Sequence, residues 1–290
     1  MRGAAILIPV LGVLAVLLLV LRPWSRRVDE RDVAWIAGTT VVPHDEAEVY
    51  SRYLDRHRRH RLAGGAFGAV FAAVVGIRYY ENLLIIGAGT VSPAADMFFG
   101  VVTGVVLGAL SAETFRLSQP RGRAAVASLA PREPVGDARV VSLARGVALA
   151  ALAWGALVLL VPVAGPRSSA AFVVAVVGLA IGGVVELTRA AVENRRRPAE
   201  SERALHVDSR IRAFAGRSLS WLQLTVAALS ATWTLAFTPV GDSAGIRAQE
   251  AGEVMVGLLV VAGLVVTIVL LRRASPRPPR HWDARATEVA

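Results

Sequence analysis

The densest group of reactive side chains in the chain is the segment DRHRRHR, residues 55–61, with two histidines and four arginines. His57 and His60 stand three residues apart, a spacing that places two imidazoles on one face of a helix. A metal site needs neutral imidazoles and usually a carboxylate as well, and the four neighbouring guanidinium groups repel a cation. The segment therefore predicts no metal site, although a pH-sensing role is open to a histidine pair.

The other polar residues form no recognisable catalytic motif. The chain has no cysteine, which excludes disulfides, thiol catalysis and thiolate metal ligands. No Ser-His-Asp arrangement, zincin helix, P-loop or Rossmann fingerprint occurs in the sequence. We expect a protein that is not an enzyme, with no catalytic residue and no cofactor.

The segment 218–237 carries more polar side chains than any other apolar stretch. Gln223, Ser230 and Thr234 follow one another at intervals of seven and four residues, so they share a helical face. Such a face can line a small polar cavity or hydrogen-bond to neighbouring helices within a membrane, and the second interpretation is favoured.

Two acidic residues near the ends of apolar stretches have an arginine three residues later. These pairs are Glu113 with Arg116 and Glu186 with Arg189. The spacing suits ion pairs along a helix, and the sequence predicts structural pairs at helix ends.

Glycines recur at every fourth position in the apolar stretches, where small residues let helix backbones approach closely. A sliding or gating interface is one interpretation of this pattern, and tight helix packing is the favoured one. The glycines predicted to pack helices are Gly64, Gly68, Gly76, Gly100, Gly104, Gly108, Gly178 and Gly182.

The elements that must position these side chains are seven apolar segments. Hydrophobic residues make up 54% of the chain while the net charge is +10, a combination that fits apolar spans separated by charged connections. About 20 helical residues cross the hydrocarbon layer, and no period-2 alternation of a membrane β-barrel is present. The predicted spans are 4–21, 62–77, 97–112, 146–163, 168–187, 218–237 and 253–271. The predicted fold class is an all-α polytopic transmembrane helical bundle of one span plus three hairpins.

The arginines predict the orientation of this bundle. The connections after spans one, three, five and seven hold nine, six, eight and five arginines, whereas the others hold one each. By the positive-inside rule, the N-terminus lies outside and the C-terminus lies in the cytoplasm. The predicted divisions are a first helix (1–21), hairpins (62–112, 146–187, 218–271), cytoplasmic segments (22–61, 113–145, 188–217) and a basic cytoplasmic tail (272–290).

The same arginines predict the partners. They are spread over four membrane-adjacent segments without a DNA- or RNA-binding motif, so we expect anionic lipid headgroups on the cytoplasmic side and no nucleic acid. Residues 44–61 predict an amphipathic helix lying at the membrane surface, with Tyr50, Tyr53, Leu54 and His57 on its apolar face.

The three hairpins also share features of sequence. Each follows an Asp-led cytoplasmic segment, beginning at Asp55, Asp137 and Asp208, with a basic residue two positions later. A triplicated hairpin is one interpretation, and chance similarity within a sequence of low complexity is the other.

The stretches EVYSRYLDRHRRHRLAGG and GALSAETFRL, together with the absence of lysine, resemble a group of actinobacterial multi-pass membrane proteins of unknown function. The resemblance implies a multi-pass protein of the plasma (inner) membrane and assigns no site residue. We expect a non-enzymatic accessory or scaffold component of a membrane complex, with a membrane protein as partner. The alternatives are a small-solute transporter built from repeated hairpins and a lipid- or pH-responsive sensor that uses residues 44–61.

Overall fold

The structure is a computed structural model that describes residues 26–78, 93–117, 136–160, 166–194, 202–238, 246–278 and Trp282. All regular elements in these ranges are α-helices, which confirms the all-α prediction for the part described. The predicted first span, residues 4–21, lies outside these ranges. The helices are α2 (Glu30–Ala37), α3 (His44–Arg78), α4 (Pro93–Leu117), α5 (Ala138–Leu160), α6 (Pro166–Asn194), α7 (Glu202–Ala236) and α8 (Ile246–Arg273).

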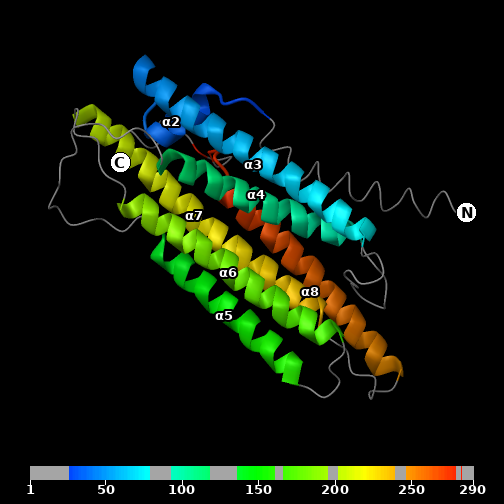
Figure 1. Cartoon of the computed structure of the whole chain (residues 1–290). Helices are drawn as coiled ribbons and strands as arrows, with labels where there is room; N and C mark the ends of the chain where they lie inside the picture. Colours follow the sequence, from blue (N-terminus) through cyan, green and yellow to red (C-terminus); the bar gives the residue numbers. More distant parts are fainter. Residues whose placement is uncertain are drawn as a thin grey trace, which may run out of the picture.

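Six long helices run side by side as a bundle (Figure 1). The consecutive pairs α3–α4, α5–α6 and α7–α8 pack against each other, as the hairpin prediction requires. Helix α7 is central, because α5, α6 and α8 all pack on it, and nearly every side chain from Ser218 to Trp233 is buried. The most polar of the predicted spans is therefore the innermost helix, where its hydroxyl and amide groups have protein partners.

In the part of the chain that the structure describes, four helices are long and apolar enough to cross a membrane. The candidate spans are Met97–Thr114, Ala138–Leu160, Ser169–Asn194 and Glu250–Arg273, which correspond to the predicted spans three, four, five and seven. Their outer faces are apolar: Leu187 on α6 is 72% exposed and Leu258 on α8 is 64% exposed. Soluble monomers rarely expose contiguous apolar surface on this scale, whereas lipid-facing helices do.

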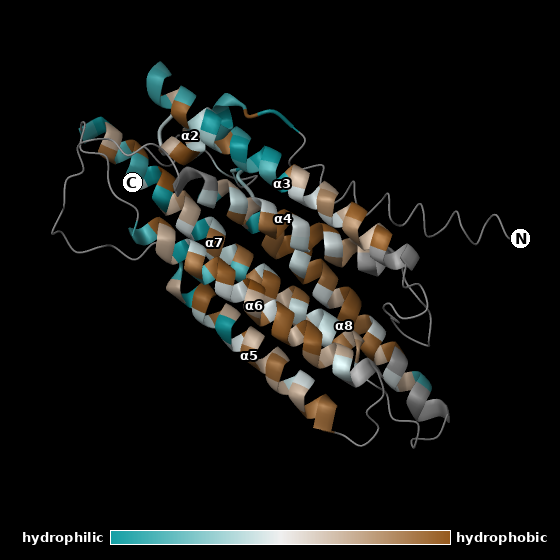
Figure 2. Cartoon of the chain, in the orientation of Figure 1, coloured by the Kyte–Doolittle hydropathy of each residue, from teal (hydrophilic) through white to brown (hydrophobic). Residues whose placement is uncertain are grey.

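Helices α3 and α7 each have 35 residues, so each is about 52 Å long at 1.5 Å per residue, against about 30 Å of hydrocarbon. The predicted spans 62–77 and 218–237 fall in their C-terminal halves but are not among the four candidate spans. The outer face of α3 there is apolar, with Phe67 71% exposed. Figure 2 shows that hydrophilic residues gather at one end of the bundle. We call this the polar end; it comprises residues 44–61 of α3, residues 202–217 of α7, helix α2 and residues 274–278.

The prediction of a separate surface helix over residues 44–61 is wrong. These residues continue without a break into the apolar half of α3. Tyr50, Tyr53 and Leu54 do share a face, but they pack against α2 and against Phe214 of α7. The sequence pattern identifies the apolar face correctly, but it does not show whether that face is covered by other helices of the protein or by the bilayer.

Helix α2 closes the polar end. Asp29 begins it with a capping box to Asp32, and Gly38, with φ 75°, ends it in the left-handed conformation that glycine adopts without strain. Trp35 packs edge-on against Phe214, and Arg210 of α7 donates to the carbonyl oxygen of Ile36 at 3.0 Å. These contacts hold α2 against α7.

Candidate functional site

The site begins with the contact between α3 and α4, where two helix backbones touch. A Cβ atom on Gly64 would collide with the carbonyl oxygen of Gly104, and one on Gly68 with that of Gly100. One turn nearer the polar end, Gly108 lies against the backbone of His60. Glycine at these positions lets the antiparallel helices approach to backbone contact, and this register brings residue 57 beside residue 113.

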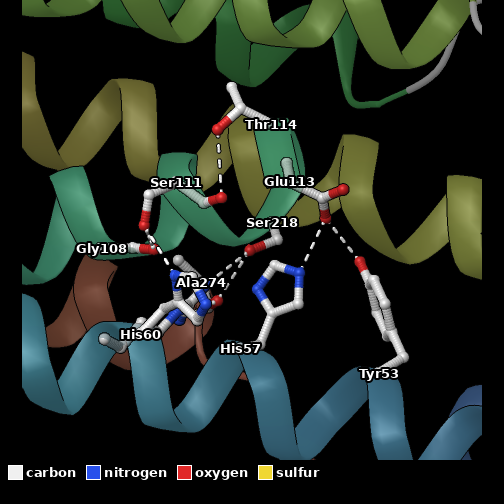
Figure 3. A network of polar contacts seen from close by, with 10 residues as sticks. Tyr53, His57, His60, Gly108, Ser111, Glu113, Thr114, Ser218 and Ala274 are labelled. Atoms are coloured by element: carbon white, nitrogen blue, oxygen red, sulfur yellow. Dashed lines mark hydrogen bonds and ion pairs between the residues drawn. The ribbon is translucent and has the colours of Figure 1, made fainter. Parts of the chain in front are cut away.

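A buried carboxylate lies at the centre of the site. Glu113 of α4 accepts a hydrogen bond from the hydroxyl of Tyr53 at 2.5 Å, and Nε2 of His57 lies 2.9 Å from the same Oε1 atom (Figure 3). The Tyr53 and His57 rings lie with centroids 4.6 Å apart and planes tilted by 57°, and Phe214 of α7 packs edge-on against both. Burial lowers the pKa of His57, and the neighbouring Glu113 carboxylate acts in the opposite direction.

Two buried arginines of α3 join this group to the end of α8. Arg61 donates to the carbonyl oxygen of Ala274 at 2.7 Å and to the hydroxyl of Ser218 at 2.8 Å, and Ser218 also donates to Ala274. Arg58 donates to the carbonyl oxygen of Pro276 at 3.2 Å. Both carbonyl groups belong to the segment that follows α8, so these guanidinium groups fix the chain where it leaves that helix.

Arg58 also fixes α2. Its guanidinium lies 2.6 Å from the Asp32 carboxylate, and both side chains are buried. A buried ion pair of this geometry is costly to break from one side, because the remaining charge is left without compensation. The C-terminal segment, α2 and α3 are thus tied together through one side chain.

The two histidines of the DRHRRHR segment have different partners. His57 faces Glu113, whereas Nδ1 of His60 lies 2.8 Å from the hydroxyl of Ser111. In the part of the chain that the structure describes, no group of three or more His, Asp or Glu residues could hold a metal ion. The histidines instead contribute polar contacts between α3 and α4.

The polar face predicted on α7 hydrogen-bonds to other groups. Nε2 of Gln223 donates to Glu186 of α6 at 2.7 Å, and Ser230 donates to the carbonyl oxygen of Val174 on α6 at 3.3 Å. Thr234 donates to the backbone of its own helix, to Ser230 at 2.9 Å. Gln223 and Ser230 therefore join α7 to α6, as expected if the polar face hydrogen-bonds to a neighbouring helix.

The acids of the two predicted helix-end pairs both contact other helices. Arg189 lies 3.7 Å from Glu186, but Arg145 of α5 binds the same carboxylate with two hydrogen bonds of 2.6 Å. Glu186 thereby joins α5, α6 and α7. Glu113 contacts Tyr53 and His57 of α3, and the Arg116 side chain lies outside what the structure describes.

The glycines of α6 differ in their surroundings. A Cβ on Gly178 would collide with the Ser230 side chain of α7, so this glycine does permit close packing. At Gly182 the prediction is wrong, since a Cβ there would meet no described atom within 4 Å. The neighbouring Ile181 and Val185 are the side chains of α6 that pack into the core at that level. The surroundings of Gly76 are not among those described.

Several residues of the site were not predicted from the sequence. They are Asp32, Arg58, Arg61, Arg145 and Ser218, together with the close-packing glycines Gly155 and Gly263. Arg58 follows Leu54 by four residues and Arg61 follows Arg58 by three, so helical spacing alone could have placed both on the buried face of α3. Comparisons with family models, with curated proteins and with solved structures found no match to this chain.

Proposed function

We propose that this chain is an integral plasma-membrane protein that acts as a non-enzymatic scaffold and holds a rigid polar end in the cytoplasm for a membrane complex. One observation carries the proposal. Helices α3 and α7 are each longer than the hydrocarbon layer is thick, and their charged halves are braced by α2 and residues 274–278.

The exposed side of the polar end supports a protein partner. Arg52 pairs with Glu48, Arg59 with Asp55, and Arg203 of α7 with Asp45 and Glu46 of α3. This surface mixes both charges, whereas a nucleic-acid-binding face is dominated by unpaired cations. A surface of mixed charge is suited to a protein whose charges complement it.

Small-solute transport is the second candidate, and the polar face of α7 is the feature that favours it. Gln223 and Ser230 would line a path at the centre of the bundle if they were released from α6. In the described residues they are instead hydrogen-bonded to that helix, beside buried Leu222, Val226 and Trp233. A sensor based on the 44–61 surface helix loses its support, because the apolar face of that helix is covered by protein.

The scaffold proposal is tested by photocrosslinking in intact membranes. A benzophenone amino acid at Arg52 or Arg203, both exposed at the polar end, is expected to yield a discrete crosslinked protein product. The matched control is Leu258 on the apolar face of α8, where no such product is expected. The product should be absent after purification of the same variants into nanodiscs, which excludes crosslinks between copies of this chain. If neither polar-end position gave a crosslinked product and proteoliposomes containing the protein showed solute flux, the scaffold proposal would be overturned in favour of the transporter.

A further inference from the structure

Three exposed arginines, one of them against a tryptophan ring, lie where α7 and α8 leave the apolar part of the bundle. Trp221 lies on α7, and the guanidinium of Arg273, in the last turn of α8, stands 5.0 Å from the centroid of its ring. Arg217 precedes Trp221 by one helical turn and is exposed, so it lies on the same face of α7. Arg272 adds a third exposed cation in the last turn of α8.

These three arginines differ from the other cations of the polar end. Arg52, Arg59 and Arg203 have acidic partners, whereas Arg217, Arg272 and Arg273 form no ion pair among the described residues. Asp137, the acid at the nearby start of α5, accepts hydrogen bonds from the backbone N–H groups of its own helix. The group is thus a local excess of positive charge.

Apolar surface continues from this group into the membrane region. Leu270 of α8 and Val147 of α5 pack with Trp221 around Leu224, and below them Val265 and Val269 of α8 are exposed. Tryptophan and arginine at such a boundary are characteristic of the headgroup level of a bilayer. The arrangement places cations at headgroup depth directly above a surface suited to acyl chains.

We infer that Arg217, Arg272 and Arg273, together with Trp221, form a binding site for the phosphate-bearing headgroup of an anionic phospholipid. Guanidinium groups bind phosphate oxygens with paired, charge-assisted hydrogen bonds, and cations near the membrane surface attract anionic headgroups. The acyl chains lie along the exposed valines of α8. The inference rests on the membrane location in the proposed function and is independent of the scaffold role.

The test measures lipid binding to the full chain in detergent by native mass spectrometry and by thermal shift, with phosphatidylglycerol and phosphatidylcholine as probes. The wild type should bind phosphatidylglycerol preferentially, and a triple variant R217Q/R272Q/R273Q should bind it at least about tenfold more weakly, since three contacts are lost. The matched control R52Q/R59Q/R203Q removes the same charge from ion-paired positions and should bind as the wild type does.

If both triple variants bound phosphatidylglycerol equally weakly, the lipid would be responding to net charge alone, and the proposed site would be overturned. Unchanged lipid binding in R217Q/R272Q/R273Q would overturn it as well. Inorganic phosphate at millimolar concentration is expected to cause no thermal shift. A shift equal to that of the lipid would identify a free anion as the ligand and would also overturn the proposal. Lipid binding is measured without a protein partner. A negative crosslinking result therefore counts against the scaffold proposal alone, and a negative lipid-binding result counts against the headgroup site alone.

Discussion

Replacing Gly104 with leucine is expected to destabilise the protein by about 3 kcal/mol or more, because overpacking a close helix contact forces backbones apart. A side chain at this position collides with the carbonyl oxygen of Gly64, which a rotamer change cannot relieve. Since α3 and α4 must separate, Glu113 would also move away from His57. The measurement is thermal unfolding in detergent, where a fall of roughly 10 °C in Tm is expected for a chain of this size.

Gly183→Leu is the control for this substitution. A Cβ atom on Gly183 of α6 would meet no described atom within 4 Å, so leucine there should leave Tm nearly unchanged. Full expression and unaltered Tm in Gly104→Leu would show that the glycine contact does not hold the two helices together.

Replacing Glu113 with leucine is the second substitution with a large expected effect, about 3–5 kcal/mol, as is typical when one member of a buried charged group is removed. Tyr53 and His57 would lose their common acceptor. Arg61 is fully buried, and burial lowers its pKa to about 10, so it stays positively charged at neutral pH. Tyr53 and the Glu113 carboxylate both act against this lowering, and without Glu113 the described acceptors of the guanidinium are the neutral groups of Ala274 and Ser218.

Two further variants separate this explanation from a loss of packing volume. Tyr53→Phe keeps the ring and removes one hydrogen bond, so a smaller loss of about 1–3 kcal/mol is expected. Glu48→Leu removes an exposed acid that pairs with Arg52, and it should change stability by less than about 1 kcal/mol. If Glu113→Leu were no more destabilising than Glu48→Leu, the buried carboxylate would not be a structural centre.

Much of the fold could be predicted because hydrophobic pattern and glycine spacing are local properties. The apolar segments of α4, α5, α6 and α8 are recognisable from composition alone. Glycine spacing places Gly64 and Gly68 on one face of α3, although it cannot identify Gly104 and Gly100 as their partners. That pairing depends on the register of two helices, which no single segment encodes.

The buried network could not be predicted for the same reason. Tyr53 and Glu113 are 60 residues apart in the chain and meet only through the α3–α4 register. The spacing of Glu113 and Arg116 predicts a local ion pair, and it gives no indication that Glu113 also contacts Tyr53 and His57 of α3. Charge alone assigns the arginines of DRHRRHR to the membrane surface, whereas Arg58 and Arg61 are buried and donate to carbonyl groups of the segment that follows α8.

The central claim, a membrane bundle with its polar end in the cytoplasm, is tested most directly by single-cysteine labelling. Because the chain contains no cysteine, each introduced thiol is the only one present. With a membrane-impermeant maleimide on intact cells, cysteines replacing Arg2 and Arg167 should be labelled, whereas cysteines replacing Arg196 and Arg277 should react only after lysis. Labelling of Arg196→Cys or Arg277→Cys in intact cells, or protection of Arg167→Cys, would contradict the predicted topology.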